Sequence, residues 1–215
     1  MKTVVIFGTT SGLGFELSKI LSESEVSLIT VNRNLVLESN PGKIHGFSIS
    51  YDLQNGGFDF SKVPEELLLN VKEVVLVLNA AKIAPLGSTI ELSTSELEET
   101  FRNNFFGYIS ILQTFVGASR KFGYGLKIFW VGTGATDQII PGWFAYSASK
   151  AALETYLLFI ASENPAISIK KFEPGIFQSK IQDQISSFYS GKNQTTQELP
   201  KPEVAASILA NLILD

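Results

Sequence analysis

The chain of 215 residues contains no cysteine and only one histidine, His45. The absence of cysteine excludes disulfide bonds, thiolate catalysis and zinc sites built on cysteine. A single histidine likewise excludes a metal site made of several histidines. His45 falls in a strand-like run away from the motifs described below, and we expect it to be an ordinary surface or core residue.

The chain also lacks a basic run and a long apolar segment. Its net charge is −4 and its pI is about 5.2, so we expect no nucleic acid partner. Polar residues interrupt the longest apolar stretches, 74–81 and 105–118, before they reach the roughly 18 residues of a membrane span. The N-terminus runs into a glycine loop with no room for a signal segment. We therefore expect a cytoplasmic protein with no membrane partner.

Short apolar runs rich in β-branched residues alternate with helical patterns along the chain. Strands are expected at residues 3–7, 26–31, 44–51, 73–78, 126–131 and 167–172. Helices are expected at 15–21, 64–70, 93–121, 178–189 and 203–214, with another around 146–150 and a mobile polar loop at 191–200. The alternation predicts an α/β fold, a parallel sheet with helices on both faces, in one domain spanning residues 1–215.

A glycine-rich loop joins the first strand to the first helix, which is the order that a dinucleotide site needs. Gly8 permits a tight turn, Gly12 lets the backbone approach a pyrophosphate, and Gly14 allows close packing of helix on strand. The spacing is G-x-x-x-G-x-G rather than the common G-x-G-x-x-G. We expect the whole loop to bind phosphate, including the intervening Thr10, Ser11 and Leu13.

Two strand ends are placed to meet the adenosine part of a dinucleotide. The second strand ends at Asn32 and Arg33, with no acidic residue to accept the 2′-hydroxyl of NAD, and an arginine there accommodates the 2′-phosphate of NADP. The alternative is that Arg33 is a solvated charge. Asp52 and Leu53 follow the third strand, where they would meet adenine, although Asp52 could equally cap a turn into residues 54–57.

Tyr146 and Lys150 stand four residues apart, so they share one face of a helix. An ammonium at roughly 4 Å would favour the phenolate by at most about 4 kcal/mol, which brings a tyrosine into acid–base range. Such a pair also occurs by chance. Thr133 presents a hydroxyl at the end of the fifth strand, where open α/β sheets bind ligands. Asn104 lies inside an apolar helix, where its amide needs partners, and a plain polar contact is the alternative reading.

Taken together and in this order, the motifs resemble the short-chain dehydrogenase/reductase family over nearly the whole chain. The matching motifs are the glycine loop, an adenine-contact pair, an Asn-Asn-Ala-Gly-like segment, a catalytic asparagine, a Tyr-x-x-x-Lys signature and a Pro-Gly segment with a following hydroxyl. In this sequence they are Gly8/Gly12/Gly14, Asp52-Leu53, Leu78-Asn79-Ala80-Ala81, Asn104 before Gly107, Tyr146 with Lys150, and Pro174-Gly175 with Ser179.

The resemblance implies a three-layer Rossmann-type doubly wound sheet of about six strands in the order 3-2-1-4-5-6. It implies a dehydrogenase or reductase of small carbonyl or alcohol substrates and a homodimer formed through the long helices, whereas the preference for NADP(H) over NAD(H) rests on Asn32 and Arg33. Asn104, Thr133, Tyr146 and Lys150 would be catalytic. The coenzyme would contact Asn79, Ala80, Ala81, Tyr146, Lys150, Pro174, Gly175, Ile176 and Ser179 as well as the loop and the strand ends named above.

The sequence departs from the family pattern at several positions. Thr133 stands 13 residues before Tyr146, where the family has its catalytic serine, and its methyl group stiffens the side chain. Phe7, Leu78 and Ala81 are also unusual, and the glycine loop holds no basic residue. The usual seventh strand is missing, so strand six should be a sheet edge protected by Lys170 and Lys171.

These departures leave two functional hypotheses. The first is an NADP(H)-dependent reductase in which Tyr146 transfers the proton and Asn104 anchors a water that links Lys150 to solvent. The second is a non-catalytic nucleotide-binding sensor or assembly subunit. The substrate is not identified by the sequence, but its pocket could be walled by Ile139, Ile140, Trp143, Phe144, Phe188 and Tyr189, each of which could equally belong to the core.

Overall fold

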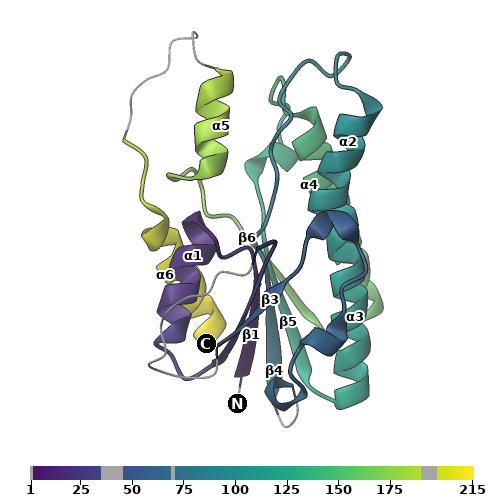
Figure 1. The fold of residues 1–215 in the computed structure, drawn as a ribbon, viewed down its shortest axis with the longest axis vertical. Coiled ribbons are helices and arrows are strands. Elements are labelled where there is room, and N and C mark those ends of the chain that lie inside the picture. Colours follow the sequence, from purple (N-terminus) through teal and green to yellow (C-terminus); the bar gives the residue numbers. More distant parts are fainter. Residues whose placement is uncertain (1, 35–45, 69–70, 190–197) are drawn as a thin grey trace.

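A computed structural model describes residues 2–34, 46–68, 71–189 and 198–215 (Figure 1). Its centre is a six-stranded parallel sheet in the order β3-β2-β1-β4-β5-β6. The strands are β1 (Lys2–Phe7), β2 (Ser27–Asn32), β3 (Gly46–Ser50), β4 (Glu73–Leu78), β5 (Gly125–Val131) and β6 (Ser168–Phe172). The predicted fold class, strand order and edge position of strand six are confirmed. His45 lies outside the described residues, as does most of the predicted loop 191–200.

Helices cover both faces of the sheet (Figure 1). One face carries α1 (Gly12–Ser22) and α6 (Pro202–Leu214), and the other carries α2 (Thr94–Phe101), α3 (Gly107–Phe122) and α4 (Phe144–Glu163). The short α5 (Lys180–Phe188) lies beyond the carboxyl ends of the strands. None of the helices in the described ranges combines the length and the apolar character that a membrane span requires.

The sequence of each central strand explains why both faces are covered. Side chains alternate between the two faces, and in β1 the four residues 4–7, which point either way, are all apolar and buried. Val4 and Ile6 pack in the core with α1 and α6, whereas Val5 and Phe7 pack in the core with α3 and α4. The sheet is therefore a rigid platform, and ligand access is left to its ends.

Two predicted helices differ from the observed elements. Residues 64–70 form only one 3₁₀ turn, Glu65–Leu67, within the described part of that segment. Its Leu67 carbonyl accepts a hydrogen bond from the Thr3 hydroxyl at 2.6 Å, and Leu67 and Leu68 are buried, which ties the chain to the sheet before β4. Tertiary packing thus overrides the helical pattern.

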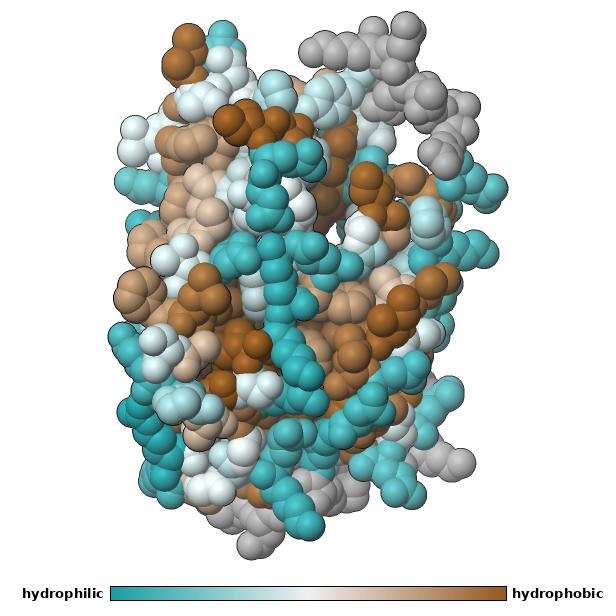
Figure 2. All heavy atoms as spheres, turned by 180° about the vertical axis from the view of Figure 1, so that it is seen from behind, coloured by the Kyte–Doolittle hydropathy of each residue, from teal (hydrophilic) through white to brown (hydrophobic). Residues whose placement is uncertain are grey.

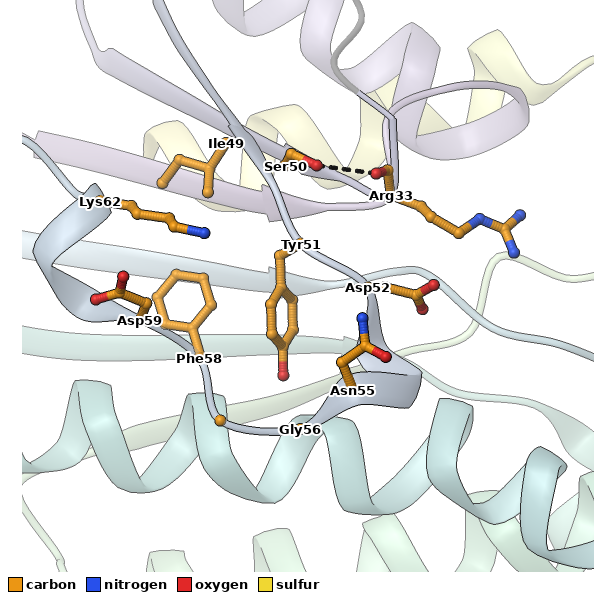
Figure 3. A pocket seen from close by; sticks show the side chains of 11 residues that line it. Arg33, Ile49, Ser50, Tyr51, Asp52, Asn55, Gly56, Phe58, Asp59 and Lys62 are labelled. Carbon is orange, nitrogen blue, oxygen red and sulfur yellow. Dashed lines mark hydrogen bonds between the residues drawn. The ribbon is translucent and has the colours of Figure 1, made fainter.

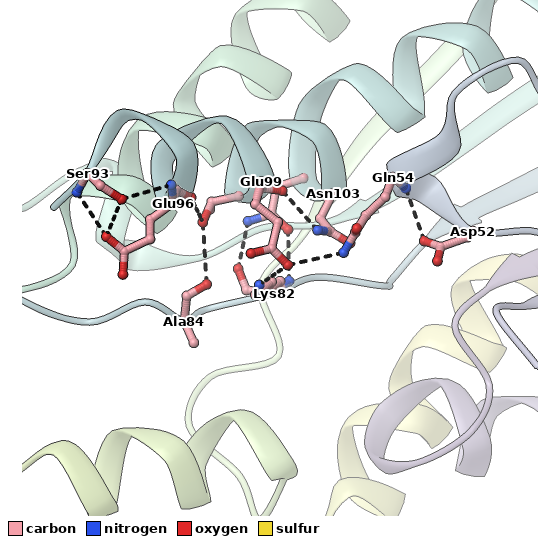
Figure 4. A network of polar contacts seen from close by, with 10 residues as sticks. Asp52, Gln54, Lys82, Ala84, Ser93, Glu96, Glu99 and Asn103 are labelled. Carbon is pink, nitrogen blue, oxygen red and sulfur yellow. Dashed lines mark hydrogen bonds and ion pairs between the residues drawn. The ribbon is translucent and has the colours of Figure 1, made fainter.

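The predicted helix at 93–121 begins as expected, with a capping box between Ser93 and Glu96 (Figure 4). It is interrupted at Arg102–Phe106 by a π-helical turn that separates α2 from α3. The interruption contains the buried Asn104. Such π-turns are frequent at functional sites because they reposition side chains within an otherwise regular helix.

Candidate active site

The predicted site residues gather where the parallel strands end. The loops that follow β1, β4, β5 and β6 carry Gly8, Asn79, Thr133 and Pro174 respectively. Carboxyl ends of parallel strands meet at one edge of a sheet, where open α/β sheets bind their ligands. The structure therefore brings the separate sequence motifs into one region.

The glycine loop is shaped by close backbone approaches. A Cβ on Gly14 would lie 1.9 Å from the Gly8 carbonyl oxygen and 2.5 Å from Nδ2 of Asn79. A Cβ on Gly8, whose φ is +93°, would lie 2.8 Å from Cβ of Ala80. Asn79 Nδ2 in turn donates to the Gly8 carbonyl at 2.6 Å. Both glycines are thus required for the packing of the loop against α1 and the end of β4.

The N-terminus of α1 fits a phosphate group. Ser11 precedes the helix without making a side-chain capping bond, so it leaves the first-turn N–H groups without that cap. Gly12 has a φ of +60°, and a Cβ there would meet nothing closer than 3.8 Å, so the backbone faces open space. A helix N-terminus with accessible N–H groups attracts anions. The pyrophosphate of a dinucleotide therefore suits this cradle.

Asn32 has a different environment from the one predicted for a coenzyme contact. It is 5 % exposed, and its Oδ1 accepts from the Thr9 backbone N–H at 2.7 Å. Its Nδ2 donates to the Thr9 hydroxyl at 2.8 Å. The side chain thus fastens the glycine loop to the end of β2. The neighbouring Arg33 is exposed. Of these two residues, Arg33 is therefore the one whose side chain is open to a ligand.

Arg33 borders a hollow of about 410 Å³ between β3 and the turns that follow it (Figure 3). The Arg33 guanidinium extends on the side of Asp52, away from Lys62. Asp52 accepts the Gln54 N–H at 3.0 Å and so caps the 3₁₀ turn Leu53–Asn55, which is the turn-capping alternative considered for this residue. The segment is held close to α3, because a Cβ on Gly107 would lie 2.4 Å from the Leu53 carbonyl oxygen.

Asn104 joins three segments around the site. Its Oδ1 accepts from the Lys82 N–H at 2.8 Å, and its Nδ2 donates to the Lys82 carbonyl at 2.8 Å and to the Ser149 hydroxyl at 3.0 Å. The Lys82 ammonium forms an ion pair with Glu99 in α2 at 2.5 Å (Figure 4). Both N–H groups of the Asn104 amide are used, but Oδ1 keeps a second lone pair for a further donor.

Tyr146 and Thr133 form the polar centre of the site. Tyr146 is 7 % exposed, in the first turn of α4. Burial raises the pKa of the Tyr146 phenol, and a hydrogen bond with the Thr133 side chain opposes this increase. Thr133 also accepts the Ala135 N–H at 3.2 Å, which fixes the turn after β5. Threonine thus provides a hydroxyl at the position where the family pattern has serine.

Lys150 is buried one helical turn after Tyr146. Its ammonium donates to the Val131 carbonyl at 2.6 Å and lies 5.4 Å from the centre of the Trp130 ring. Burial lowers the pKa of Lys150 to about 8. The structure does not contain the predicted stabilisation of the Tyr146 phenolate by Lys150. Burial is the main influence on the pKa of the phenol, and the Lys150 ammonium donates to the Val131 carbonyl.

The segment after β6 lies against the glycine loop. A Cβ on Gly12 would be 3.9 Å from Cβ of Ser179 and 3.8 Å from the Phe177 ring. The Ser179 hydroxyl accepts from the Gln182 N–H at 3.1 Å and so caps α5. Ile176 is 68 % exposed and available for contact with a ligand, and Gly175 has a φ of +72°.

The predicted pocket walls divide into two groups. Ile140 and Trp143 pack against a cluster formed by Ile83, Ala135 and Tyr146. Ile139, Phe144 and Phe188 are exposed, and the Tyr189 hydroxyl donates to the Pro141 carbonyl at 2.9 Å. Five apolar residues missed in the sequence also belong to this region: Ile83, Leu86, Ala135, Ile181 and Ile185. The apolar face of α5 was the available signal for the last two.

Polar groups suited to a metal ion are not clustered in the described parts of the chain. No group of three or more histidine, cysteine, aspartate or glutamate side chains there could hold one. Among the same residues, Trp143 Nε1 and Ser147 Oγ are buried polar atoms without a hydrogen-bond partner. Trp143 packs edge-on against Tyr146, so the apolar region around the phenol includes an unpaired N–H group.

Comparison with known proteins supports the assignment that the geometry suggests. Residues 2–190 match the family model for short chain dehydrogenases. A Saccharomyces cerevisiae protein named benzil reductase ((S)-benzoin forming) IRC24 is 26 % identical, over 99 % of this chain and 90 % of its own. A Bacillus cereus benzil reductase ((S)-benzoin forming) is 22 % identical, over 99 % and 94 %.

A solved structure shows the same fold. The crystal structure of the KRED1-Pglu enzyme superposes with a TM-score of 0.81, covers 100 % of this chain and 95 % of its own, and is 22 % identical. The family match, the sheet order and the arrangement of the sequence motifs agree with one another. The chain belongs to the short-chain dehydrogenase/reductase family of oxidoreductases, which act between alcohol and carbonyl groups with NAD(P).

Proposed function

We propose that the protein is an NADP(H)-dependent carbonyl reductase in which Tyr146 is the general acid. The observation that carries this proposal is that the buried Tyr146 phenol lies beside the Thr133 side chain, with the Lys150 ammonium buried one turn further along α4. A polarising hydroxyl, a proton donor and a cation are the groups that hydride addition to a carbonyl requires.

The glycine loop and α1 hold the pyrophosphate, and Arg33 pairs with the 2′-phosphate of NADP(H). An arginine suits a phosphate because its planar guanidinium donates two parallel hydrogen bonds. Ile176 and Ser179 contact the carboxamide, and Lys150 binds the hydroxyls of the nicotinamide ribose. When bound, the nicotinamide supplies the hydride.

Tyr146 transfers its phenolic proton to the carbonyl oxygen. Its raised pKa keeps the phenol protonated at neutral pH, which is the form that a reduction needs. Thr133 donates a hydrogen bond to the same oxygen and holds the carbonyl in a reactive orientation. Asn104 positions α4 through Ser149, and its remaining lone pair can accept from a water that links Lys150 to solvent. That water stays a prediction.

The substrate that we propose is an aryl ketone or an aryl 1,2-diketone. Tyr146 is surrounded by apolar and aromatic side chains, and Trp143 packs edge-on against it with ring centres 6.0 Å apart. The unpaired Trp143 N–H could donate to a second carbonyl oxygen. Two relatives named benzil reductase give this choice independent support, since benzil is an aryl 1,2-diketone.

We further propose a cytoplasmic homodimer that forms through α3 and α4. Leu158 and Phe159 on α4 are 66 % and 60 % exposed, and Phe106 before α3 is 54 % exposed. Figure 2 shows that apolar side chains reach the surface on the rear of the molecule, beside a hydrophilic band. Exposed apolar patches of this kind often mark interfaces. Light scattering of the purified protein and of Leu158→Glu tests this proposal, and a wild-type monomer contradicts it.

The proposed reaction is tested by following NADPH and NADH oxidation with benzil and a panel of simpler ketones. We expect NADPH to support turnover of aryl ketones at least tenfold better than NADH. A parallel binding titration separates the two functional hypotheses. Tight NADPH binding with no turnover of any carbonyl would favour the non-catalytic nucleotide-binding role.

A further inference from the structure

Lys171, on β6, lies at the centre of a charged cluster outside the proposed reaction centre. Its ammonium is 3.1 Å from the Glu154 carboxylate of α4, 2.9 Å from Glu173 and 3.8 Å from Asp137. The Lys171 side chain is 26 % exposed and that of Glu154 is 28 % exposed. An edge strand needs only a solvated lysine for protection. Lys171 instead connects three elements that carry proposed site residues.

The cluster shares an aromatic ring with Lys150. Lys171 pairs with Trp130 in the register of β6 and β5. Its ammonium lies 5.4 Å from the centre of the Trp130 ring, which is also the distance for the Lys150 ammonium. The two cations are therefore within twice that distance of each other. At such a range, in a partly buried setting, charges influence one another.

The backbone leaves space for this arrangement at Gly132. A Cβ there would lie 2.6 Å from Cε and 2.8 Å from Cγ of Lys171. The Gly132 N–H donates to the Phe172 carbonyl at 2.8 Å, so the two strands are held together at this point. The path of the Lys171 side chain thus depends on a glycine that directly precedes Thr133.

We propose that Lys171 and Glu154 are a pair of positioning residues that adjust the charge environment of Lys150 beside the Trp130 ring. Glu154 lies one turn after Lys150 on α4, so the pair places one negative and one positive charge near the buried ammonium. The inference rests on the proposed role of Lys150 in holding the coenzyme. It adds that residues without ligand contact shift the pH at which Lys150 carries its charge.

The two members of the pair act in opposite directions. Glu154 raises the pKa of Lys150, and Lys171 lowers it, while burial has the largest effect. The other polar and charged groups around Lys150 are Tyr146 and Ser149 on its own helix, Asp137 and Glu173 bound to Lys171, and the Val131 carbonyl. Removing the charge of Glu154 should therefore lower the pKa of Lys150, and removing the charge of Lys171 should raise it.

The test is an NMR titration of the protein alone, labelled with ¹³C and ¹⁵N in lysine. The Lys150 signal is assigned by its loss in Lys150→Arg, and its midpoint should lie near pH 8. We expect Glu154→Gln to lower the midpoint and Lys171→Met to raise it, each by roughly half a pH unit to one unit. Lys170→Met, on the exposed neighbouring lysine, should leave it unchanged.

The charge-preserving variants Lys171→Arg and Glu154→Asp should keep the midpoint near that of the wild type. They also cover the case in which a neutral variant fails to fold. Midpoints that do not move, or that move in the same direction in both neutral variants, overturn the proposal. Because no substrate or coenzyme is present, this result is independent of whether the protein reduces carbonyls. If it does, the alkaline limb of its pH–rate profile should shift with the NMR midpoint.

Discussion

Asn32 and Thr9 are joined by two hydrogen bonds, one to the Thr9 backbone N–H at 2.7 Å and one to its hydroxyl at 2.8 Å. Both residues are buried. This pair fixes the start of the glycine loop to the end of β2. Asn32 therefore occupies the position of a ribose-binding residue but uses its amide within the protein.

Replacing Asn32 by alanine should weaken the binding of NADPH and NADH by similar factors. The variant loses the two bonds to Thr9 and leaves a buried N–H unpaired, which costs about 1–3 kcal/mol. The looser glycine loop affects the pyrophosphate, which the two coenzymes share. Fluorescence titrations with both coenzymes measure this effect. A selective loss of NADPH binding would show that Asn32 reads the 2′-phosphate directly.

Arg33→Ala is the matched variant one residue further on. Arg33 is exposed and has no predicted structural role, so its loss should remove only the contact with the 2′-phosphate. We expect NADPH affinity to fall about 10- to 100-fold, because a charged hydrogen bond contributes about 1.5–3 kcal/mol. NADH affinity should stay within about twofold. Equal weakening of both coenzymes would contradict the proposed NADP preference.

Gly14→Ala and Gly12→Ala should differ sharply in stability. The new methyl group at Gly14 would lie 1.9 Å from the Gly8 carbonyl oxygen, so α1 must move, and we expect a loss of about 3 kcal/mol. At Gly12 the nearest atom is 3.8 Å away, and only the positive φ opposes alanine, at a cost of about 1–2 kcal/mol. Urea unfolding of both variants checks the order. A less stable Gly12→Ala would refute the packing argument.

Thr133→Ser should retain the activity of the wild type, whereas Thr133→Val should lose about 10²- to 10³-fold in turnover number. Serine keeps a hydroxyl beside the Tyr146 phenol, and valine keeps only the shape. Steady-state kinetics at saturating NADPH distinguish the two outcomes. Full activity of the valine variant would mean that Thr133 does not polarise the carbonyl.

Lys150 should make stability depend on pH in a defined direction. Its pKa in the folded protein is about 8, below the ordinary 10.5, so the cost of burying its charge is fully present below pH 8. Between these values the unfolded chain binds more protons, and stability rises with pH. Relative to that of Lys150→Met, the free energy of unfolding of the wild type should increase by about 2 kcal/mol between pH 7 and pH 9.5. Urea unfolding measures both proteins across this range. A difference between their free energies of unfolding that does not change with pH would contradict the buried charge.

Much of the fold could be predicted because its signals are local. The apolar run of β1, the glycine spacing and the Ser93–Glu96 capping box each act over a few residues, and the structure contains all three. The strand order came from the family resemblance. The short turn at Glu65–Leu67 was wrongly predicted as a helix because distant packing at Thr3 decides its conformation.

The parts of the site that were missed depend on contacts between distant residues. Asn32 meets Thr9 from 23 positions away, and Asn104 meets Ser149 from 45 positions away. A single sequence carries no signal for either pair. Lys171 could be placed on an edge strand, but its partners Asp137 and Glu154 come from two other elements. Motif spacing thus predicts the proposed reacting groups well, but it does not predict the residues that hold those groups in place.

The central claim, that Tyr146 donates the proton, is tested most directly by Tyr146→Phe. Phenylalanine keeps the ring that packs against Trp143 and removes only the hydroxyl. NADPH titration and thermal unfolding serve as controls that the site is intact. The account predicts normal coenzyme binding and a 10²- to 10⁴-fold lower rate of NADPH oxidation with the best carbonyl of the panel. A variant that oxidises NADPH within about threefold of the wild-type rate would contradict it.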